Sequence, residues 1–175
     1  ILDCTFNINS SLKARLDQLR IEAELAVREG CKHLILSDKN INKEKSSIPM
    51  AIAIGAINSR LTDLGIRGFA SINVQTSEAL DTHSFAVLLG VGATTVNPYL
   101  ALDSIYQRYN KKLFGKFSFE ECVKRYVKSI DNGLLKIMSK MGISILSSYR
   151  GGCNFEAVGL SRSVVAEYFP GMVSR

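Results

Sequence analysis

The chain has 175 residues, of which 46% are hydrophobic and 22% are charged. These proportions exclude a disordered chain, and the length suits one globular domain with a buried core. No apolar run approaches the ~20 residues that cross a bilayer, and no signal peptide precedes the first element. We therefore expect a soluble, cytoplasmic protein that does not bind a membrane.

The two ends of the chain predict that it is part of something longer. It begins with Ile1 rather than Met, inside an apparent strand, and it ends at Arg175 in a linker-like stretch. Residues 1–175 are therefore expected to form one domain cut from a longer polypeptide.

The four cysteines lie too far apart to form a local metal or redox motif. They are Cys4, Cys31, Cys122 and Cys153, and no Cys-x-x-Cys pair occurs. A zinc site is therefore not predicted, and the thiols are expected to be reduced.

The net charge of +6 is concentrated in residues 108–140, which hold nine Lys and Arg against three acidic residues. Aromatic residues interleave with these cations: Tyr109, Phe114, Phe117, Phe119 and Tyr126. This mixture occurs in nucleic-acid-binding surfaces, but helical spacing also explains the aromatic residues as core. The cations then form either a solvated helix face or a surface docked on an acidic neighbouring domain.

Strands and helices are expected to alternate along the chain. Strands are predicted at residues 2–6, 33–37, 69–74, 93–96 and 143–146. Helices are predicted at 11–29, ending at Gly30, at 46–65 with hydroxyl capping, and at 78–89. A long helical stretch runs from the Ser118–Glu121 capping box to Gly142, with a break or kink at Asn132-Gly133. A further helix precedes Ser118 and another follows residue 146.

This alternation predicts an α/β fold with a mostly parallel sheet of about five strands and flanking helices. The strand from His33 to Ser37 is apolar enough to be covered on both faces. Five strands are too few to close an eight-stranded barrel. The sheet is therefore either open or part of an incomplete (β/α) barrel that residues outside the chain complete.

Polar residues follow the strands where ligands bind in parallel α/β folds. Asp38, Gln75, Glu78 and Asn97 fall at or just beyond the carboxyl ends of their strands. They would converge on one opening if the sheet curves. Each one is also explained as a helix cap or turn residue.

Arg150, Gly151 and Gly152 are the candidates for binding an anion. They follow the last expected strand, so the glycine N–H groups and the guanidinium could hold a phosphate. The alternative is a tight turn whose arginine pairs with a carboxylate from another domain. His33 and His83 are the only histidines, and no nucleophile–base pair or phosphate-loop motif occurs, so no metal ligand and no catalytic residue is predicted.

Motifs along almost the whole chain resemble the central domain of the large chain of glutamate synthase. They are Leu2-Asp3-Cys4-Thr5-Phe6, Leu34 to Asp38, Ser77-Glu78-Ala79, Gly92 to Ala101, Gly133 to Ser144, Ser148-Tyr149-Arg150-Gly151 and Phe155 to Leu160. The chain departs from relatives at Asn58-Ser59-Arg60 and at Ser84, where histidines are common, and at Gly152-Cys153, where Ala-Gln is common. A required histidine role at those positions is therefore not expected.

The resemblance implies a parent enzyme with a glutaminase domain, this central domain, a barrel that binds FMN and an iron–sulfur cluster, and a β-helix. Glutamine is hydrolysed, ammonia passes through a tunnel to 2-oxoglutarate, and the flavin reduces the resulting imine to glutamate. The electron donor would be a small reductase subunit or ferredoxin. The present chain would be the non-catalytic connector, without a cofactor of its own, and would help to wall the tunnel.

The residues expected at the tunnel or at a domain interface are Asp38, Gln75, Glu78, His83, Asn97, Tyr149 and Arg150. Two alternatives stay open. The run from Thr82 to Val96 resembles the phosphate half of a flavin barrel, so the chain could be a barrel fragment that binds FMN or a phosphate ligand. The basic segment could instead make it a nucleic-acid-binding module.

Overall fold

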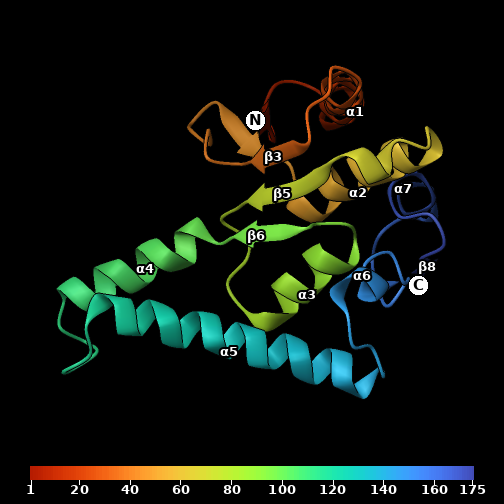
Figure 1. The fold of residues 1–175 in the computed structure, drawn as a ribbon. Coiled ribbons are helices and arrows are strands. Elements are labelled where there is room, and N and C mark those ends of the chain that lie inside the picture. The colour runs from red at the N-terminus through yellow and green to blue at the C-terminus, as the bar shows by residue number, and fades with distance from the viewer.

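A parallel sheet of four strands forms the centre of the computed structural model, which describes all of residues 1–175. The strands are β1 (Leu2–Asp3), β3 (His33–Ser37), β5 (Ser71–Gln75) and β6 (Thr95–Asn97), and they lie side by side in this order (Figure 1). Within this sheet the strands lie in the order in which they occur along the chain, so the sheet is wound in a single direction. The predicted α/β class and parallel sheet are confirmed, and the sheet is open rather than closed into a barrel.

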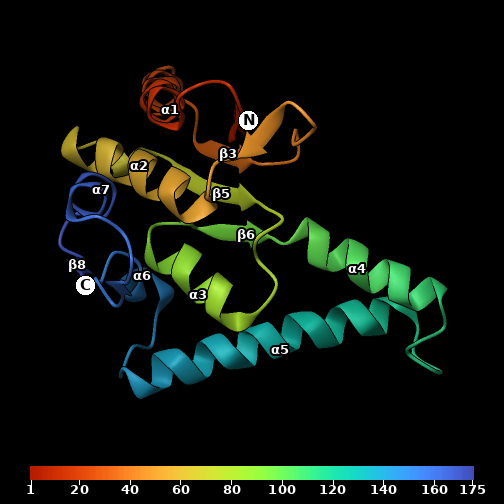
Figure 2. The ribbon, with the colours of Figure 1, turned by 180° about the vertical axis from the view of Figure 1, so that it is seen from behind.

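Three helices connect the strands and cover one face of the sheet (Figures 1 and 2). They are α1 (Leu12–Arg28), α2 (Met50–Asp63) and α3 (Thr82–Gly90). The strand residues directed at them are apolar and almost completely buried: Leu34, Leu36, Ile72 and Val74. The burial of this apolar layer between sheet and helices supplies most of the core.

Helix α1 follows the sequence expectation closely. The side chain of Ser11 caps it by accepting a hydrogen bond from the Ala14 N–H at 3.4 Å, and Gly30 ends it with a φ of +91°. Its buried side chains recur every three to four residues and are Leu16, Leu19, Ala23 and Val27.

The starts of α2 and α3 differ from the prediction. Ser46 and Ser47 do not cap α2, because they belong to β4 (Lys45–Ser47), which pairs antiparallel with β2 (Thr5–Asn7). The first N–H group of α2, that of Met50, instead donates to Glu78 at 3.0 Å. Helix α3 begins at Thr82 rather than at residue 78, because Asp81 caps it through the Ser84 N–H at 2.8 Å.

Helix α4 (Tyr99–Asn110) extends beyond the carboxyl ends of the strands, and α5 (Phe119–Lys140) runs back antiparallel to it and along α3 (Figures 1 and 2). Of the break or kink predicted at Asn132-Gly133, the break is wrong, since α5 is continuous. A Cβ atom at Gly133 would lie 2.5 Å from the side chain of Thr82, so the glycine allows α5 to approach α3 rather than bending it. Neither α5 nor any other helix is both long enough and apolar enough to span a membrane.

The aromatic residues of the basic segment are core only in part. Tyr126 is half-buried and packs against the main core, whereas the rings nearer the tip of the helix pair lie outside it. Tyr109 packs on Phe119 with ring centroids 5.8 Å apart, and Arg125 lies 4.2 Å from the centroid of Phe117. Tyr109 and Phe117 are nonetheless exposed. The tip of the helix pair lies beyond the sheet, so its rings have neighbours on one side only.

The segment after α5 contains no strand of the central sheet, so the fifth strand predicted at residues 143–146 is wrong. The chain turns there into the short helix α6 (Leu146–Tyr149), which buries Tyr149. It continues through β7 (Glu156–Ala157), α7 (Arg162–Tyr168) and β8 (Val173–Ser174), with β7 and β8 paired in parallel.

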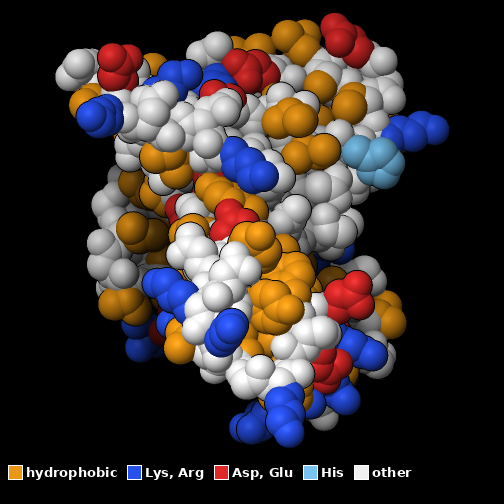
Figure 3. Space-filling view, turned by 90° about the vertical axis from the view of Figure 1, so that its left-hand side faces the viewer, with side chains coloured by type: hydrophobic (Ala, Val, Ile, Leu, Met, Phe, Trp, Pro, Cys, Tyr) orange, Lys and Arg blue, Asp and Glu red, His pale blue; other side chains and the backbone are white.

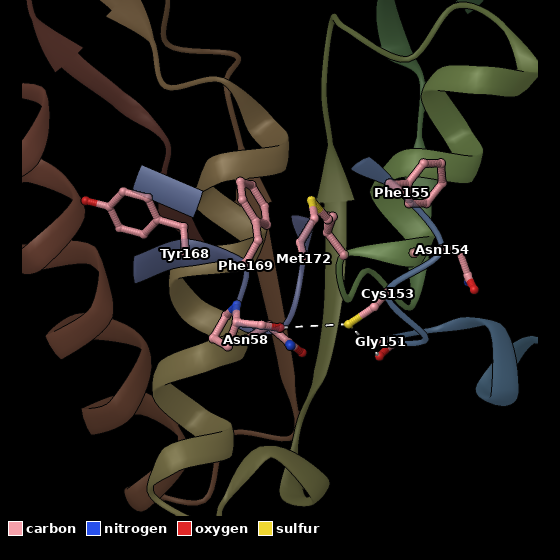
Figure 4. Close-up of a pocket in the computed structure, with 11 residues that line it drawn as sticks. Asn58, Gly151, Cys153, Asn154, Phe155, Tyr168, Phe169 and Met172 are labelled. Carbon is pink, nitrogen blue, oxygen red and sulfur yellow. Dashed lines mark hydrogen bonds between the residues drawn. The ribbon is translucent and has the colours of Figure 1, made fainter. Parts of the chain in front are cut away.

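The end of α7 packs closely on α2. Figure 4 shows Phe169 and Met172 side by side in a small pocket of about 60 Å³, with the Tyr168 ring directed toward α1. Arg20 of α1 stacks on that ring at 4.8 Å. A Cβ atom at Gly55 of α2 would lie 2.5 Å from the backbone oxygen of Tyr168, so only glycine permits this approach.

The thiols are free, as expected, and differ in burial. Cys4 and Cys122 are buried, whereas Cys31 and Cys153 are exposed. Burial raises the pKa of the Cys4 thiol to about 12, which makes it unreactive at neutral pH.

We expect Gly55→Ala to destabilise the protein by about 2 kcal/mol, because the added methyl group meets backbone that cannot move aside. Alanine favours a helix over glycine by about 1 kcal/mol, so a gain in stability would contradict the close packing. The measurement is urea-induced unfolding. Gly68→Ala is the matched control, since its Cβ atom would meet open space.

Candidate functional site

The face of the sheet opposite the helices is mostly polar and partly exposed. Its outermost row, at the carboxyl ends of the four strands, consists of Asp3, Ser37, Gln75 and Asn97, which stand in register with one another. The next rows are Ile35, Asn73 and Thr95, and then His33 and Ser71. These nine side chains are called the open face below.

Hydrogen bonds join the side chains of the open face from strand to strand. Ser37 donates to Gln75 at 2.9 Å, and Thr95 donates to Asn73 at 2.8 Å. In the innermost row, the Nδ1 atom of His33 and the Ser71 hydroxyl lie 2.8 Å apart. The pairs hold these side chains in place while leaving donors and acceptors for further ligands.

The open face overturns one sequence expectation. The strand from His33 to Ser37 is not covered on both faces, because His33 and Ile35 are exposed while Leu34 and Leu36 are buried. At the edge of the sheet, Thr95 and Asn97 are exposed as well. The face is thus built to meet either solvent or another part of a larger protein.

Asp38 lies one residue beyond the open face, fully buried in the loop that follows β3. Its carboxylate accepts hydrogen bonds from the Thr76 hydroxyl at 2.7 Å, and from the N–H and hydroxyl groups of Ser77 at 2.9 and 3.1 Å. The bonds tie the loop after β3 to the loop after β5. Burial raises the pKa of the neighbouring Tyr99 hydroxyl, and the Asp38 charge raises it further.

Glu78 and His83 line one small depression of about 290 Å³ between α2 and α3. Glu78 accepts the hydrogen bond from Met50 at the start of α2, where the helix dipole favours a negative charge. Burial raises the pKa of Glu78, and the negative charge of Asp38 adds to this, while the Met50 N–H group opposes it.

Figure 3 looks onto the end of the molecule at which α4 and α5 meet. Apolar side chains gather in the middle of this face, with charged side chains of both signs around them. The exposed apolar residues on the two helices include Leu100, Tyr106, Tyr109 and Val127. The basic segment is thus neither a uniformly polar helix face nor a uniformly basic patch.

Tyr149, Arg150, Gly151 and Gly152 lie at the opposite, amino end of the sheet, so they do not join the other candidates. No strand precedes them, and both glycine N–H groups already have partners: Gly151 donates to Gly90 at 2.8 Å and Gly152 to Tyr149 at 3.3 Å. The Nε atom of Arg150 is buried and has no hydrogen-bond partner.

The structure thus divides the seven interface candidates into three groups: Gln75 and Asn97 on the open face, Asp38, Glu78 and His83 around the loops at the carboxyl end, and Tyr149 and Arg150 at the amino end. Sequence reasoning missed Asp3, Ser37, Asn73 and Thr95. A signal for Asn73 was present, because polar and apolar residues alternate strictly from Ser71 to Gln75.

Comparison with known proteins identifies the family. Residues 1–161 match the family described as the glutamate synthase central domain. The chain belongs to this family. No group of three or more His, Cys, Asp or Glu side chains in it is placed to hold a metal ion.

Three relatives show how the glutamate synthase central domain relates to longer proteins. The large chain of glutamate synthase [NADPH] from Azospirillum brasilense is 52% identical over 99% of this chain, which covers 12% of that protein. The corresponding protein of Bacillus subtilis is 42% identical over 95% of the chain and 11% of its own length. The chloroplastic ferredoxin-dependent glutamate synthase of Spinacia oleracea is 40% identical over 99% of the chain and 11% of its own length. The chain spans 11 to 12% of the length of these relatives.

Replacing Asp38 with Asn should destabilise the central domain by about 2–3 kcal/mol. The new amide group would face hydroxyl and N–H donors in a buried site, where lost hydrogen bonds are costly. Thermal or urea unfolding measures the effect. Asp131→Asn, at an exposed position on α5, is the control and should change stability by less than about 0.5 kcal/mol.

Glu78→Gln should stabilise the domain at neutral pH, because the amide oxygen still accepts from the Met50 N–H group and the amide lacks the negative charge that its surroundings disfavour. The carboxyl of Glu78 has a higher pKa in the folded than in the unfolded protein. Its ionised form therefore lowers the free energy of unfolding at pH values above the folded pKa. The difference between variant and wild type should therefore shrink as the pH falls toward the unfolded value of 4.5. Unfolding curves of both proteins between neutral and acidic pH measure it, and a difference that grows on acidification would contradict the assignment.

Proposed function

We propose that the chain is the connecting domain of a glutamate synthase, placed between a glutaminase domain and an FMN-binding domain. In this proposal, the open face forms part of the wall of the passage that carries ammonia between them. Membership of the central domain family supports the parent activity. The mostly polar, partly exposed face of the sheet is the observation that supports the passage.

The chemistry of the open face suits a small neutral molecule such as ammonia. Hydroxyl and amide groups on neighbouring strands can exchange hydrogen bonds with it along the sheet. Only Asp3 carries a full charge, and it is held at the rim by Thr5 and Asn40 at 2.8 and 3.1 Å. Ammonia released into bulk water would be protonated and diluted, so a sheltered path preserves the reactive form.

The winding of the sheet also fits a connector that other residues complete. Four successive strands pair in chain order, with the helices on one side, as in half of a (β/α) barrel. Strands β1 and β6 each have one edge without a partner strand in this chain. Further residues of the parent protein would pair with these edges and enclose the polar face.

In the parent reaction, glutamine hydrolysis yields glutamate and ammonia, and ammonia adds to 2-oxoglutarate to give an imine. A flavin supplies the hydride that reduces this imine to a second glutamate. We place the FMN and the iron–sulfur cluster in the neighbouring domain and no catalytic residue in this chain. We propose a small reductase subunit or ferredoxin as the electron donor and the cytoplasm as the location.

The alternative of an FMN-binding fragment gains no support from the small apolar pocket beside the Gly151 turn at the amino end of the sheet. The pocket beside Gly90 and Gly151 has a volume of about 60 Å³ and is lined by Phe155, Phe169 and Met172. A flavin phosphate would find neither room nor unpaired glycine N–H groups there.

The test uses the protein that contains this chain, with Thr95→Trp on the open face. The indole group should obstruct the passage, so glutamine-dependent glutamate synthesis should fall strongly. Synthesis from added ammonium should fall much less, since ammonia then enters from solvent, and glutaminase activity should release free ammonia. Steady-state assays with glutamine or ammonium as the nitrogen source measure this ratio.

Ile21→Trp, at an exposed site on α1, controls for added bulk and should leave the ratio unchanged. Equal losses of glutamine- and ammonium-dependent synthesis in Thr95→Trp would indicate general damage and would overturn the proposed passage.

A further inference from the structure

A second polar site lies at the amino end of the sheet, away from the open face. It is a pocket of about 510 Å³ without a single large apolar side chain in its lining. Helix α2 contributes Asn58, Ser59, Thr62 and Asp63, the short helix η1 (Arg67–Phe69) contributes Arg67 and Gly68, and the C-terminal part contributes Arg150, Gly151 and Pro170. Figure 4 shows two of these residues, Asn58 and Gly151, on facing sides of the neighbouring small pocket.

Arg67 is fixed in this pocket by three oxygen atoms, none of which belongs to a carboxylate. It donates to the Asn58 side chain at 2.7 Å, and to the backbone oxygens of Ala70 and Gly92 at 2.6 and 2.9 Å. The bonds hold its positive charge in place without neutralising it.

Arg150 has hydrogen-bond donors that lack a partner in the chain. Its guanidinium group makes no hydrogen bond and no ion pair within the chain, and its Nε atom is buried. Buried polar groups almost always have a partner, so this orphan donor marks an incomplete site. The chain offers one acid in the pocket lining, Asp63, and it pairs with neither arginine.

The two arginines are close enough to influence each other. Burial lowers the pKa of Arg67, and the positive charge of Arg150 lowers it further. Two like charges held together in a half-buried pocket repel each other, and an anion between them would turn this repulsion into attraction.

We propose that this pocket binds a carboxylate, with Arg150 donating hydrogen bonds to it and Arg67 acting as a fixed positive charge beside it. Guanidinium groups match the planar geometry of a carboxylate, and the polar lining leaves the pocket open to water-soluble groups. The carboxylate comes either from a small free acid or from an Asp or Glu side chain elsewhere in the parent polypeptide.

The test uses succinate as the probe, added to the protein that contains this chain, with chloride holding the ionic strength constant. Succinate should raise the midpoint of thermal unfolding in the wild type, and Arg150→Gln should abolish this rise. Arg162→Gln, at an exposed arginine on α7, is the matched control and should retain it.

A second variant covers the case in which Arg150→Gln does not fold. Thr62→Glu places a carboxylate at an exposed position of the pocket lining and should also remove the succinate effect. If succinate has no effect on the wild type, a crystal structure of the same protein decides. An Asp or Glu side chain of the parent polypeptide bound to the Arg150 guanidinium would support the proposal with that side chain as the carboxylate. A pocket that contains nothing but water would overturn the proposal. An equal rise in wild type and Arg150→Gln would overturn it as well.

Discussion

The fold depends on the burial of one face of a four-stranded parallel sheet against α1, α2 and α3. Side chains alternate between the two faces of a strand, so burying Leu34, Leu36, Ile72 and Val74 on one face necessarily presents the residues between them on the other. Since those residues are mostly polar, the same alternation that builds the core also builds the open face. Core and candidate functional surface are therefore specified together by two short stretches of sequence.

Two carboxylates at the carboxyl end, the buried Asp38 and the more exposed Glu78, organise the loops around this sheet. Asp38 joins the loops after β3 and β5, and Glu78 supplies the acceptor that α2 lacks at its first N–H group. Both residues follow strand ends, which is where ligand-binding residues of α/β proteins occur, yet their hydrogen bonds are internal. Position at a strand end thus does not by itself assign a binding role, whereas the exposed side chains of Thr95 and Asn97 remain accessible to other parts of the protein.

The sequence predicted those features that local patterns determine. Helix α1, its Ser11 cap and the strand at residues 33–37 were correct because periodicity and capping act over a few residues. The break at Gly133 and the strand at residues 143–146 were wrong because the deciding contacts are distant: Thr82 meets Gly133, and the buried Tyr149 draws the chain into α6. For the same reason the sequence indicated Arg150 but not Arg67, which lies more than eighty residues away and joins it only in the folded chain.

The central claim is that the open face lines an enclosed polar passage in the parent protein, and the accessibility of Thr95→Cys tests it most directly. The thiol should react with a small methylating reagent that can enter the passage, but not with a bulky maleimide, while Ile21→Cys on α1 should react with both. Mass spectrometry separates these sites from the exposed native Cys31 and Cys153. Equal reaction of Thr95→Cys and Ile21→Cys with the maleimide would show that the face is open to solvent and would contradict the account.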